Sequence, residues 1–215
     1  MDKYQVTTDT FNRLAKQYQD KYMDLDMYND TYDLFCSCID NEQAELLDVA
    51  CGPGNITRYI LAKRPNFKIQ GIDAAPNMVE LAQINNPNVE FRVMDGREIA
   101  SLNMQYDAII CGFYLPYLSK DDAEQLIRAA STLLRSQGIL YLSGMEGDEE
   151  NSGYPESISG DKVFIHYHDI KHLSAALKDK GFEILDVRYK DGPKQSTIVT
   201  RDFFIIARLT ECKEI

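Results

Sequence analysis

The chain has 215 residues, enough for one domain with its own hydrophobic core and no need of disulfide or metal support. Acidic residues outnumber basic ones by 34 to 23, and the formal net charge of -11 argues against a nucleic-acid partner, because the phosphate backbone is itself anionic. No apolar stretch has the length of a signal-peptide core or a membrane-spanning helix, so we expect a cytoplasmic protein with no membrane span.

Residues 1–42 predict helices that stand apart from the rest of the chain. Phe11, Leu14 and Tyr18 recur at helical spacing, and a second apolar stripe follows. These helices are expected to pack on the sheet as a cap. A sharper interpretation makes some of the tyrosines, including Tyr18 and Tyr22, part of a lid over a ligand.

From residue 43 onward, short apolar runs alternate with helical patterns. We expect strands at 46–50, 67–72, 89–94, 106–111, 139–143, 182–189 and 197–208. Repeated strand–helix–strand units imply right-handed crossovers and a parallel sheet covered on both faces by helices. The last connection contains Asp-Gly-Pro and is too short for a helix, so the last two strands should form an antiparallel hairpin. The fold class is therefore α/β, a Rossmann-like doubly wound sheet of seven strands in one domain.

Two helices carry clear end signals. Ser119 and Asp122 form a capping box, and Gly138 is expected just past the end of the helix that follows them. Asp169 and Gly181 bracket a later helix in the same way.

The segment LLDVACGPGN, residues 46–55, passes from an apolar strand into a glycine turn. Gly52 and Gly54 permit close approach of a ligand to the backbone and expose the amides that open the next helix. A dinucleotide-binding loop would have a third glycine, but this chain has Thr57 at that position. The turn therefore predicts a nucleoside-bearing ligand other than a dinucleotide.

Further residues follow the next strands at the same edge of the predicted sheet. Asp73 lies 19 residues past Gly54, where doubly wound folds place an acid that binds ribose hydroxyls. Asp95-Gly96 follows the third strand, and Cys111 ends the fourth. These strand ends converge on one crevice, which is where open α/β sheets bind ligands.

Five segments resemble the successive motifs of class I S-adenosylmethionine-dependent methyltransferases: DVACGPGN, GIDAAPNMVELA, VMDGREI, YDAIICGFYLPYL and LLRSQGILYLSG. Within that class, the motifs are most similar to those of the small-molecule enzymes grouped with the ubiquinone/menaquinone C-methyltransferases. The resemblance covers about residues 46–208 and implies S-adenosylmethionine as methyl donor, S-adenosylhomocysteine as product, and a small-molecule acceptor. Jointly these motifs are specific, whereas any one of them alone is weak.

The resemblance also implies roles for individual residues. The cofactor contacts it implies are Ala50, Gly52, Gly54, Asp73, Ala74, Met78, Asp95, Gly96 and Cys111. The loop backbone would hold the methionine part, Asp73 the ribose, and Asp95 the adenine amine. Met78 would pack against the adenine, and Cys111 would lie near the sulfonium.

Candidates for the acceptor pocket are aromatic. Phe113, Tyr114 and Tyr117 follow the fourth strand, and Tyr18 and Tyr22 belong to the predicted cap. Aromatic faces suit a cationic donor, although packing against neighbouring helices is an equally good interpretation of the first three.

All histidines lie in FIHYHDIKH, as His166, His168 and His172. An acceptor that must lose a proton would need a base, and His166 or His168 is the best candidate. A polar role outside the chemistry is the alternative for both. Metal binding is not expected, because the third histidine falls on a helix and no acidic ligand is evident.

The expected organisation is a cap at 1–42, a cofactor-binding half at 43–145, and a substrate side at 146–215 with a loop, a late helix and the hairpin. The stretch 143–162, rich in Gly, Ser and acid, predicts a mobile loop that covers the acceptor. Two alternatives remain open: a non-catalytic S-adenosylmethionine-binding regulatory protein and a nicotinamide-dependent oxidoreductase. Either a monomer or a homodimer fits the sequence.

Overall fold

The computed structural model describes residues 2–155, 161–193 and 200–210. Its helices are α1 (Lys3–Tyr22), α2 (Asn29–Ser37), α3 (Asn55–Lys63), α4 (Pro76–Asn85), α5 (Lys120–Leu133) and α6 (Ile170–Asp179), with 3₁₀ turns η1 (Gly96–Ser101), η2 (Leu115–Tyr117) and η3 (Glu149–Asn151). Its strands are β1 (Glu45–Val49), β2 (Lys68–Asp73), β3 (Glu90–Val93), β4 (Tyr106–Cys111), β5 (Leu134–Met145), β6 (Phe182–Asp191) and β7 (Arg201–Leu209).

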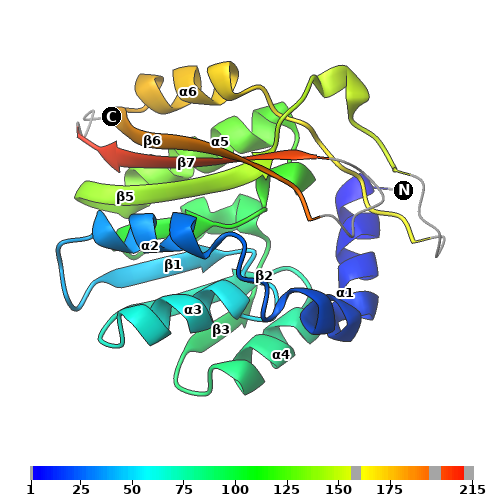
Figure 1. Cartoon of the computed structure of the whole chain (residues 1–215), viewed down its shortest axis with the longest axis horizontal. Helices are drawn as coiled ribbons and strands as arrows, with labels where there is room; N and C mark the ends of the chain where they lie inside the picture. The colour runs from blue at the N-terminus through cyan, green and yellow to red at the C-terminus, as the bar shows by residue number, and fades with distance from the viewer. Residues whose placement is uncertain (1, 156–160, 194–199, 211–215) are drawn as a thin grey trace.

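The strands form one sheet in the order β3-β2-β1-β4-β5-β7-β6 (Figure 1). Strands β1 to β5 pair in parallel, whereas β7 runs antiparallel to both β5 and β6. This confirms the predicted α/β fold, including the antiparallel hairpin at its end. Strands β2 and β3 are added on one side of β1, and β4 and β5 on the other. The connections that leave β1 and β4 therefore run to opposite sides, and a crevice opens between the carboxyl ends of these two strands.

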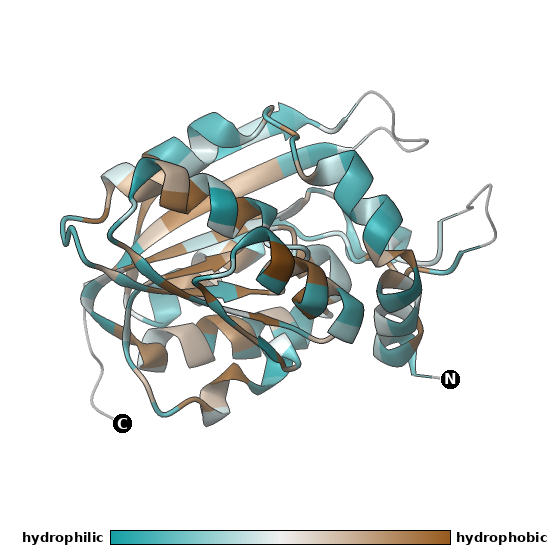
Figure 2. Ribbon diagram, turned by 90° about the horizontal axis from the view of Figure 1, so that it is seen from below, coloured by the Kyte–Doolittle hydropathy of each residue, from teal (hydrophilic) through white to brown (hydrophobic). Residues whose placement is uncertain are grey.

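Helices cover both faces of the sheet, as predicted. On one face α5, α6 and η1 pack against strand residues such as Leu47, Ile109 and Phe203. On the other face α2 and α3 pack against strand residues such as Leu46 and Tyr141. Figure 2 shows this layering as apolar strands enclosed between helices whose outer faces are hydrophilic.

Helix α1 stands apart from these two layers, beyond the carboxyl ends of the parallel strands (Figure 1). It is tied to α4, because Asn12 Oδ1 accepts from the Asn77 amide and the Asn12 carbonyl accepts from Asn77 Nδ2, both at 2.8 Å. Its other side meets the segment before α6, where Thr7 Oγ1 accepts from the amide of Phe164 at 3.2 Å. The helix thus bridges the two halves of the crevice.

The structure corrects the expected boundary between α5 and β5. The sequence predicts that the helix ends just before Gly138, but it ends at Leu133 and β5 begins at Leu134. Leu134 already has extended backbone, and the chain turns at Gln137, whose φ is +66°. Gly138 serves this turn, because a Cβ there would lie 2.8 Å from the carbonyl oxygen of Arg135. The pattern of an apolar helix face followed by glycine therefore predicted the wrong end for this helix.

The described parts of the connection between β5 and α6, residues 146–155 and 161–169, contain little regular structure and are held by backbone contacts. It contains η3 and two isolated bridges, Glu146 with His168 and Gly153 with Ile165. Part of the predicted mobile loop, 156–160, and the first residues of the last predicted strand, 197–199, lie outside the described residues. Within the described ranges, no helix has the length and apolar character needed to cross a membrane.

Candidate active site

The turn after β1 adopts left-handed backbone at three positions: Ala50 (φ +56°), Gly52 (φ +53°) and Gly54 (φ +77°). Ala50 holds this conformation although it carries a Cβ, which costs of the order of 1 kcal/mol. Gly54 is also confined by packing, because a Cβ there would lie 2.5 Å from Nδ2 of Asn86, which donates to the Gly54 carbonyl. Gly54 therefore shapes the turn and seats α3 against α4.

Thr57 has a role of its own where a dinucleotide-binding loop has glycine. Its hydroxyl donates to Asp48 Oδ2 at 2.6 Å, and both residues are buried beneath the turn. Burial raises the pKa of Asp48 to about 7, although the Thr57 hydrogen bond lowers it. This contact fixes the first turn of α3 to β1.

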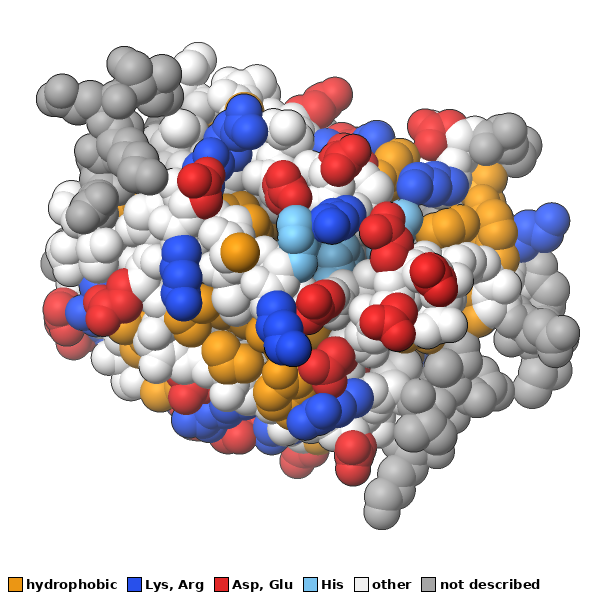
Figure 3. Space-filling model, turned by 90° about the horizontal axis from the view of Figure 1, so that it is seen from above, with side chains coloured by type: hydrophobic (Ala, Val, Ile, Leu, Met, Phe, Trp, Pro, Cys, Tyr) orange, Lys and Arg blue, Asp and Glu red, His pale blue; other side chains and the backbone are white. Residues whose placement is uncertain are grey.

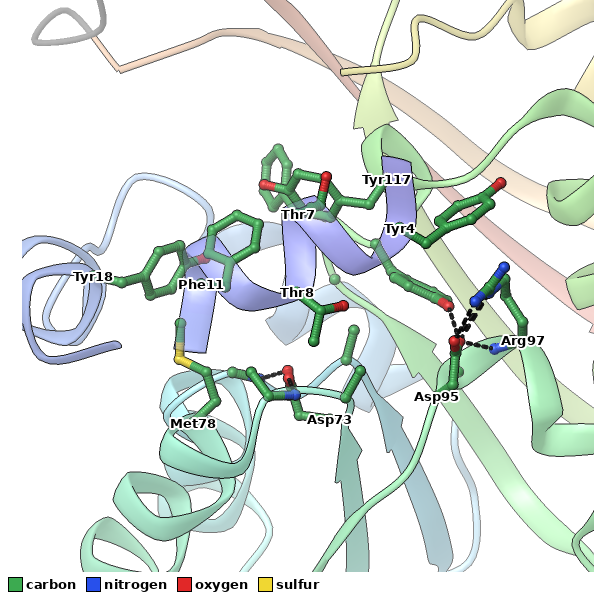
Figure 4. A pocket seen from close by; sticks show the side chains of 18 residues that line it. Tyr4, Thr7, Thr8, Phe11, Tyr18, Asp73, Met78, Asp95, Arg97 and Tyr117 are labelled. Atoms are coloured by element: carbon green, nitrogen blue, oxygen red, sulfur yellow. Dashed lines mark hydrogen bonds and ion pairs between the residues drawn. The ribbon is translucent and has the colours of Figure 1, made fainter. Parts of the chain in front are cut away.

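Asp73, at the end of β2, organises the crevice with one carboxylate. Its Oδ2 accepts from the Gly52 amide at 2.9 Å, and its Oδ1 accepts from the Ala75 amide at 2.8 Å (Figure 4). Ala75 supplies no side-chain cap to α4, so Asp73 takes over part of that task. Burial raises the pKa of Asp73 to about 6, and the two amides act in the opposite direction. Each oxygen keeps a lone pair for a further donor.

Asp95 lies across the crevice and is held by an arginine. Arg97 Nη2 contacts Asp95 Oδ2 at 2.6 Å, and the Arg97 guanidinium stacks 3.9 Å from the ring centre of Tyr4. Burial acts to raise the pKa of Asp95, but the hydrogen bonds from Arg97 outweigh it and hold that pKa below its usual value. Tyr114 packs so closely on Gly96 that a Cβ there would lie 2.7 Å from its ring.

These elements enclose a first cavity (Figure 4). Of the predicted cofactor contacts, those that line it are Ala50, Gly52, Asp73, Ala74, Met78, Asp95 and Gly96. Helix α1 closes it with side chains that the sequence analysis did not assign to the site: Tyr4, Thr7, Thr8 and Phe11. Arg97 is a further addition. The spacing of these α1 residues follows one helix face, which from sequence alone is indistinguishable from a core-packing stripe.

A second cavity adjoins the first on the other side of the turn. The two share a wall made by Tyr18, Ala50, Gly52, Gly112, Phe113 and Tyr117. Beyond this wall the second cavity is lined by Tyr22, Leu25, Tyr28, Tyr32, Cys51, Asn55, Ile56, Met145, Pro193, Thr200 and Asp202. The predicted acceptor-pocket residues thus divide, with Tyr22 in the second cavity, Tyr114 in the first, and Tyr18, Phe113 and Tyr117 in both.

Other predicted residues lie elsewhere. Gly54 lines neither cavity, and Cys111 is fully buried in the core with burial raising the pKa of its thiol. His166 and His168 also line neither cavity. They are buried behind η2, where His168 Nε2 donates to the Leu115 carbonyl at 2.8 Å.

This placement does not support a role for either histidine as the base. Burial lowers the pKa of His166 to about 4 and leaves its Nε2 without a hydrogen-bond partner. His172 instead lies with its Nε2 2.7 Å from Oε1 of Glu124. Figure 3 shows histidine atoms at the surface among charged side chains. No group of three His, Cys, Asp or Glu side chains within the described part of the chain is arranged to hold a metal ion.

Comparison with known proteins agrees with this geometry. Residues 46–138 match the family model described as a methyltransferase domain. The chain is 34% identical over 137 residues to malonyl-[acyl-carrier protein] O-methyltransferase of Acetivibrio thermocellus, covering 62% of this chain and 47% of that protein. It is 29% identical over 98 residues to demethylmenaquinone methyltransferase of Thermotoga maritima, covering 46% of this chain and 42% of that one. The chain thus spans less than half the length of either relative.

The fold is shared over nearly the whole chain. The solved structure of magnesium protoporphyrin IX methyltransferase from Synechocystis PCC 6803, with bound S-adenosylhomocysteine, superposes with a TM-score of 0.73. The match covers 96% of this chain and 99% of that one at 18% identity. Residues 46–138 are thus similar to a methyltransferase domain, and the chain as a whole has the fold of a solved methyltransferase, with a glycine turn after β1, acids at the ends of β2 and β3 and an antiparallel β7.

Proposed function

We propose that the chain transfers a methyl group from S-adenosylmethionine to a small-molecule acceptor, with the donor in the first cavity and the acceptor in the second. The observation that carries this proposal is the shared wall: Gly52 and Phe113 border both cavities, so the two reactants would meet there. In-line displacement requires this alignment of a nucleophile with the methyl carbon.

The first cavity suits the donor by the chemistry of its lining. Asp73 keeps acceptor capacity for ribose hydroxyls, whereas both oxygens of Asp95 already accept from Arg97, so an exocyclic amine would have to share that carboxylate. Met78 and Phe11 offer apolar surface for a base, and the backbone of the turn lies open to the amino-acid end. When bound, S-adenosylmethionine supplies an electrophilic methyl group on a sulfonium. The protein's own part is to orient the reactants and to exclude water, which α1 does by closing the cavity.

No side chain is needed as a covalent intermediate, and an acceptor that reacts through a neutral lone pair needs no base before attack. This agrees with the position of His166 and His168 outside both cavities. The division into an α1 cap, a cofactor-binding half and a substrate side belongs to this proposal. A cytoplasmic location, and the choice between monomer and homodimer, stay predictions.

Titration calorimetry with S-adenosylmethionine, S-adenosylhomocysteine and NAD tests the donor. We expect micromolar binding of the first two and none of NAD; binding of NAD alone would overturn the proposal. Release of S-adenosylhomocysteine with a library of small acceptors then tests turnover. Donor binding without turnover on any acceptor would favour the non-catalytic regulatory alternative.

A further inference from the structure

The second cavity contains a buried acid for which the proposed donor site has no use. Asp202, on β7, is 1% exposed and lies in the cavity lining beside Thr200 and Met145. Its Oδ2 accepts from the hydroxyl of Tyr28 at 2.6 Å. Its Oδ1 is buried and has no partner in hydrogen-bond geometry, although burial raises the pKa of the acid and the hydroxyls of Tyr28 and Thr200 act to lower it. An unpaired carboxylate oxygen in such a place is costly unless a ligand supplies the missing donor.

The described lining of the cavity does not supply a cation to Asp202. No Lys, Arg or His occurs among the described residues that line this cavity. The nearest candidate by strand register is Lys190, which pairs with Asp202 across β6 and β7. Its ammonium is already engaged, 2.5 Å from Asp30 and 2.8 Å from the carbonyl of Met27. Within the described residues, no cation that lines this cavity pairs with the carboxylate.

The rest of the lining is aromatic. Tyr28 lies with its ring centre 5.0 Å from that of Phe113 and 5.3 Å from that of Phe204, so its hydroxyl is held at Asp202 by packing as well as by the hydrogen bond. The ring centres of Tyr18 and Tyr22 lie 4.5 Å apart on the side of α1, with the ring planes tilted by 45°. Aromatic faces attract organic cations and repel anions. An acceptor that is a free carboxylate would meet a buried acid and these ring faces with no compensating charge in the described lining.

We propose that the second cavity binds a small acceptor bearing an amino group, with Asp202 Oδ1 accepting from its N–H and the tyrosine rings enclosing its body. This inference rests on the proposed function, because it takes the second cavity to be the acceptor site. It differs from what the name of the malonyl-[acyl-carrier protein] relative indicates for that protein, whose methylated atom is oxygen.

The test uses the chain saturated with S-adenosylhomocysteine and three probes that share one body: 2-phenylethylamine, 2-phenylethanol and phenylacetate. We expect the amine to bind about tenfold or more tightly than the other two, because only it can form a charge-assisted hydrogen bond with Asp202. Equal or tighter binding of the alcohol or the carboxylate, or no binding of the amine, would overturn the inference. This comparison needs no variant.

Asp202→Asn then assigns the effect to the residue. Its amide oxygen can still accept from Tyr28, so the contact between β7 and the start of α2 is kept. We expect amine affinity to fall about tenfold while affinity for S-adenosylhomocysteine is unchanged. Glu183→Gln is the matched control, since it removes an exposed acid from neighbouring β6 that lines neither cavity, and it should leave amine affinity unchanged. An equal loss in both variants would contradict a specific role for Asp202.

The two proposals fail in different ways. Loss of all S-adenosylhomocysteine binding in the native chain would overturn the proposed function and the inference with it. Normal S-adenosylhomocysteine binding with no preference for the amine would overturn the inference alone and leave the methyltransferase proposal standing.

Discussion

Asp73 accepts a hydrogen bond from the backbone amide of Gly52 at 2.9 Å, so the acid at the end of β2 holds in place the glycine turn that follows β1. The same carboxylate caps α4 through the Ala75 amide. Two strand ends and one helix start are thus fixed by a single side chain. A ligand that donates a hydrogen bond to Asp73 would therefore bind more or less tightly according to how well the turn holds this carboxylate in place.

Asp73→Ala is expected to weaken S-adenosylhomocysteine binding about ten- to hundredfold, because it removes charged hydrogen-bond acceptors and releases the turn. Titration calorimetry measures this change. Asp40→Ala, which removes an exposed acid that lines neither cavity, is the control and should bind normally. Unchanged affinity in Asp73→Ala would show that the donor site lies elsewhere.

The pH dependence of donor binding should follow Asp73. Its pKa is raised to about 6, so the carboxylate protonates and loses acceptor capacity as pH falls through that value. Affinity for S-adenosylhomocysteine is expected to decrease from about pH 7 to about pH 5. The stability of the free protein should change with pH in the opposite direction. The pKa of Asp73 is higher in the folded state than in the unfolded state, so its contribution to the free energy of unfolding is lost as pH rises through about 6. Asp73→Asn should flatten both profiles, and profiles identical to the native ones would assign the titration to another group.

Thr57→Val is expected to lower the free energy of unfolding by about 1–3 kcal/mol, because it leaves the buried carboxylate of Asp48 without its donor. Urea denaturation measures the loss. Thr57→Ser keeps the hydroxyl and should recover most of the stability. If serine and valine destabilise equally, packing rather than the hydrogen bond explains the threonine.

Asn12→Ala tests whether α1 acts as a cover. The substitution removes the side-chain acceptor for the Asn77 amide and loosens α1 from α4. We expect S-adenosylhomocysteine to dissociate several times faster, as measured by stopped-flow fluorescence, with little change in thermal stability. Lys16→Ala, on the exposed side of the same helix, is the control. Equal dissociation rates in the two variants would argue against a lid.

The fold was predictable because its signals are local. The glycine turn, the acids after successive strands, the missing third glycine at Thr57 and the short last connection all lie within a few residues of the features they define. The error at Gly138 arose from the same local reasoning, since a glycine after an apolar helix face is typical of a C-cap, and here it belongs to a turn inside β5.

The sequence places most of the predicted cofactor contacts in the first cavity, but it gave no signal for Asp202 in the second. Asp73 and Asp95 stand next to motif residues, whereas Asp202 meets Tyr28 across 174 positions of the chain. The pair meets because the start of α2 packs on β7, where the Tyr28 ring lies against Phe204. The role of the histidines as a base stays a prediction, because their short spacing carries no information on which side of η2 they lie.

The wall common to both cavities has a kinetic consequence. Tyr18 belongs to α1, whereas Ala50, Gly52 and Phe113 follow the ends of strands. Helix α1 therefore closes the proposed donor cavity and also forms part of the proposed acceptor cavity. If closing α1 completes both cavities together, catalysis should be sequential and ordered, with S-adenosylmethionine entering first and the methylated acceptor leaving before S-adenosylhomocysteine.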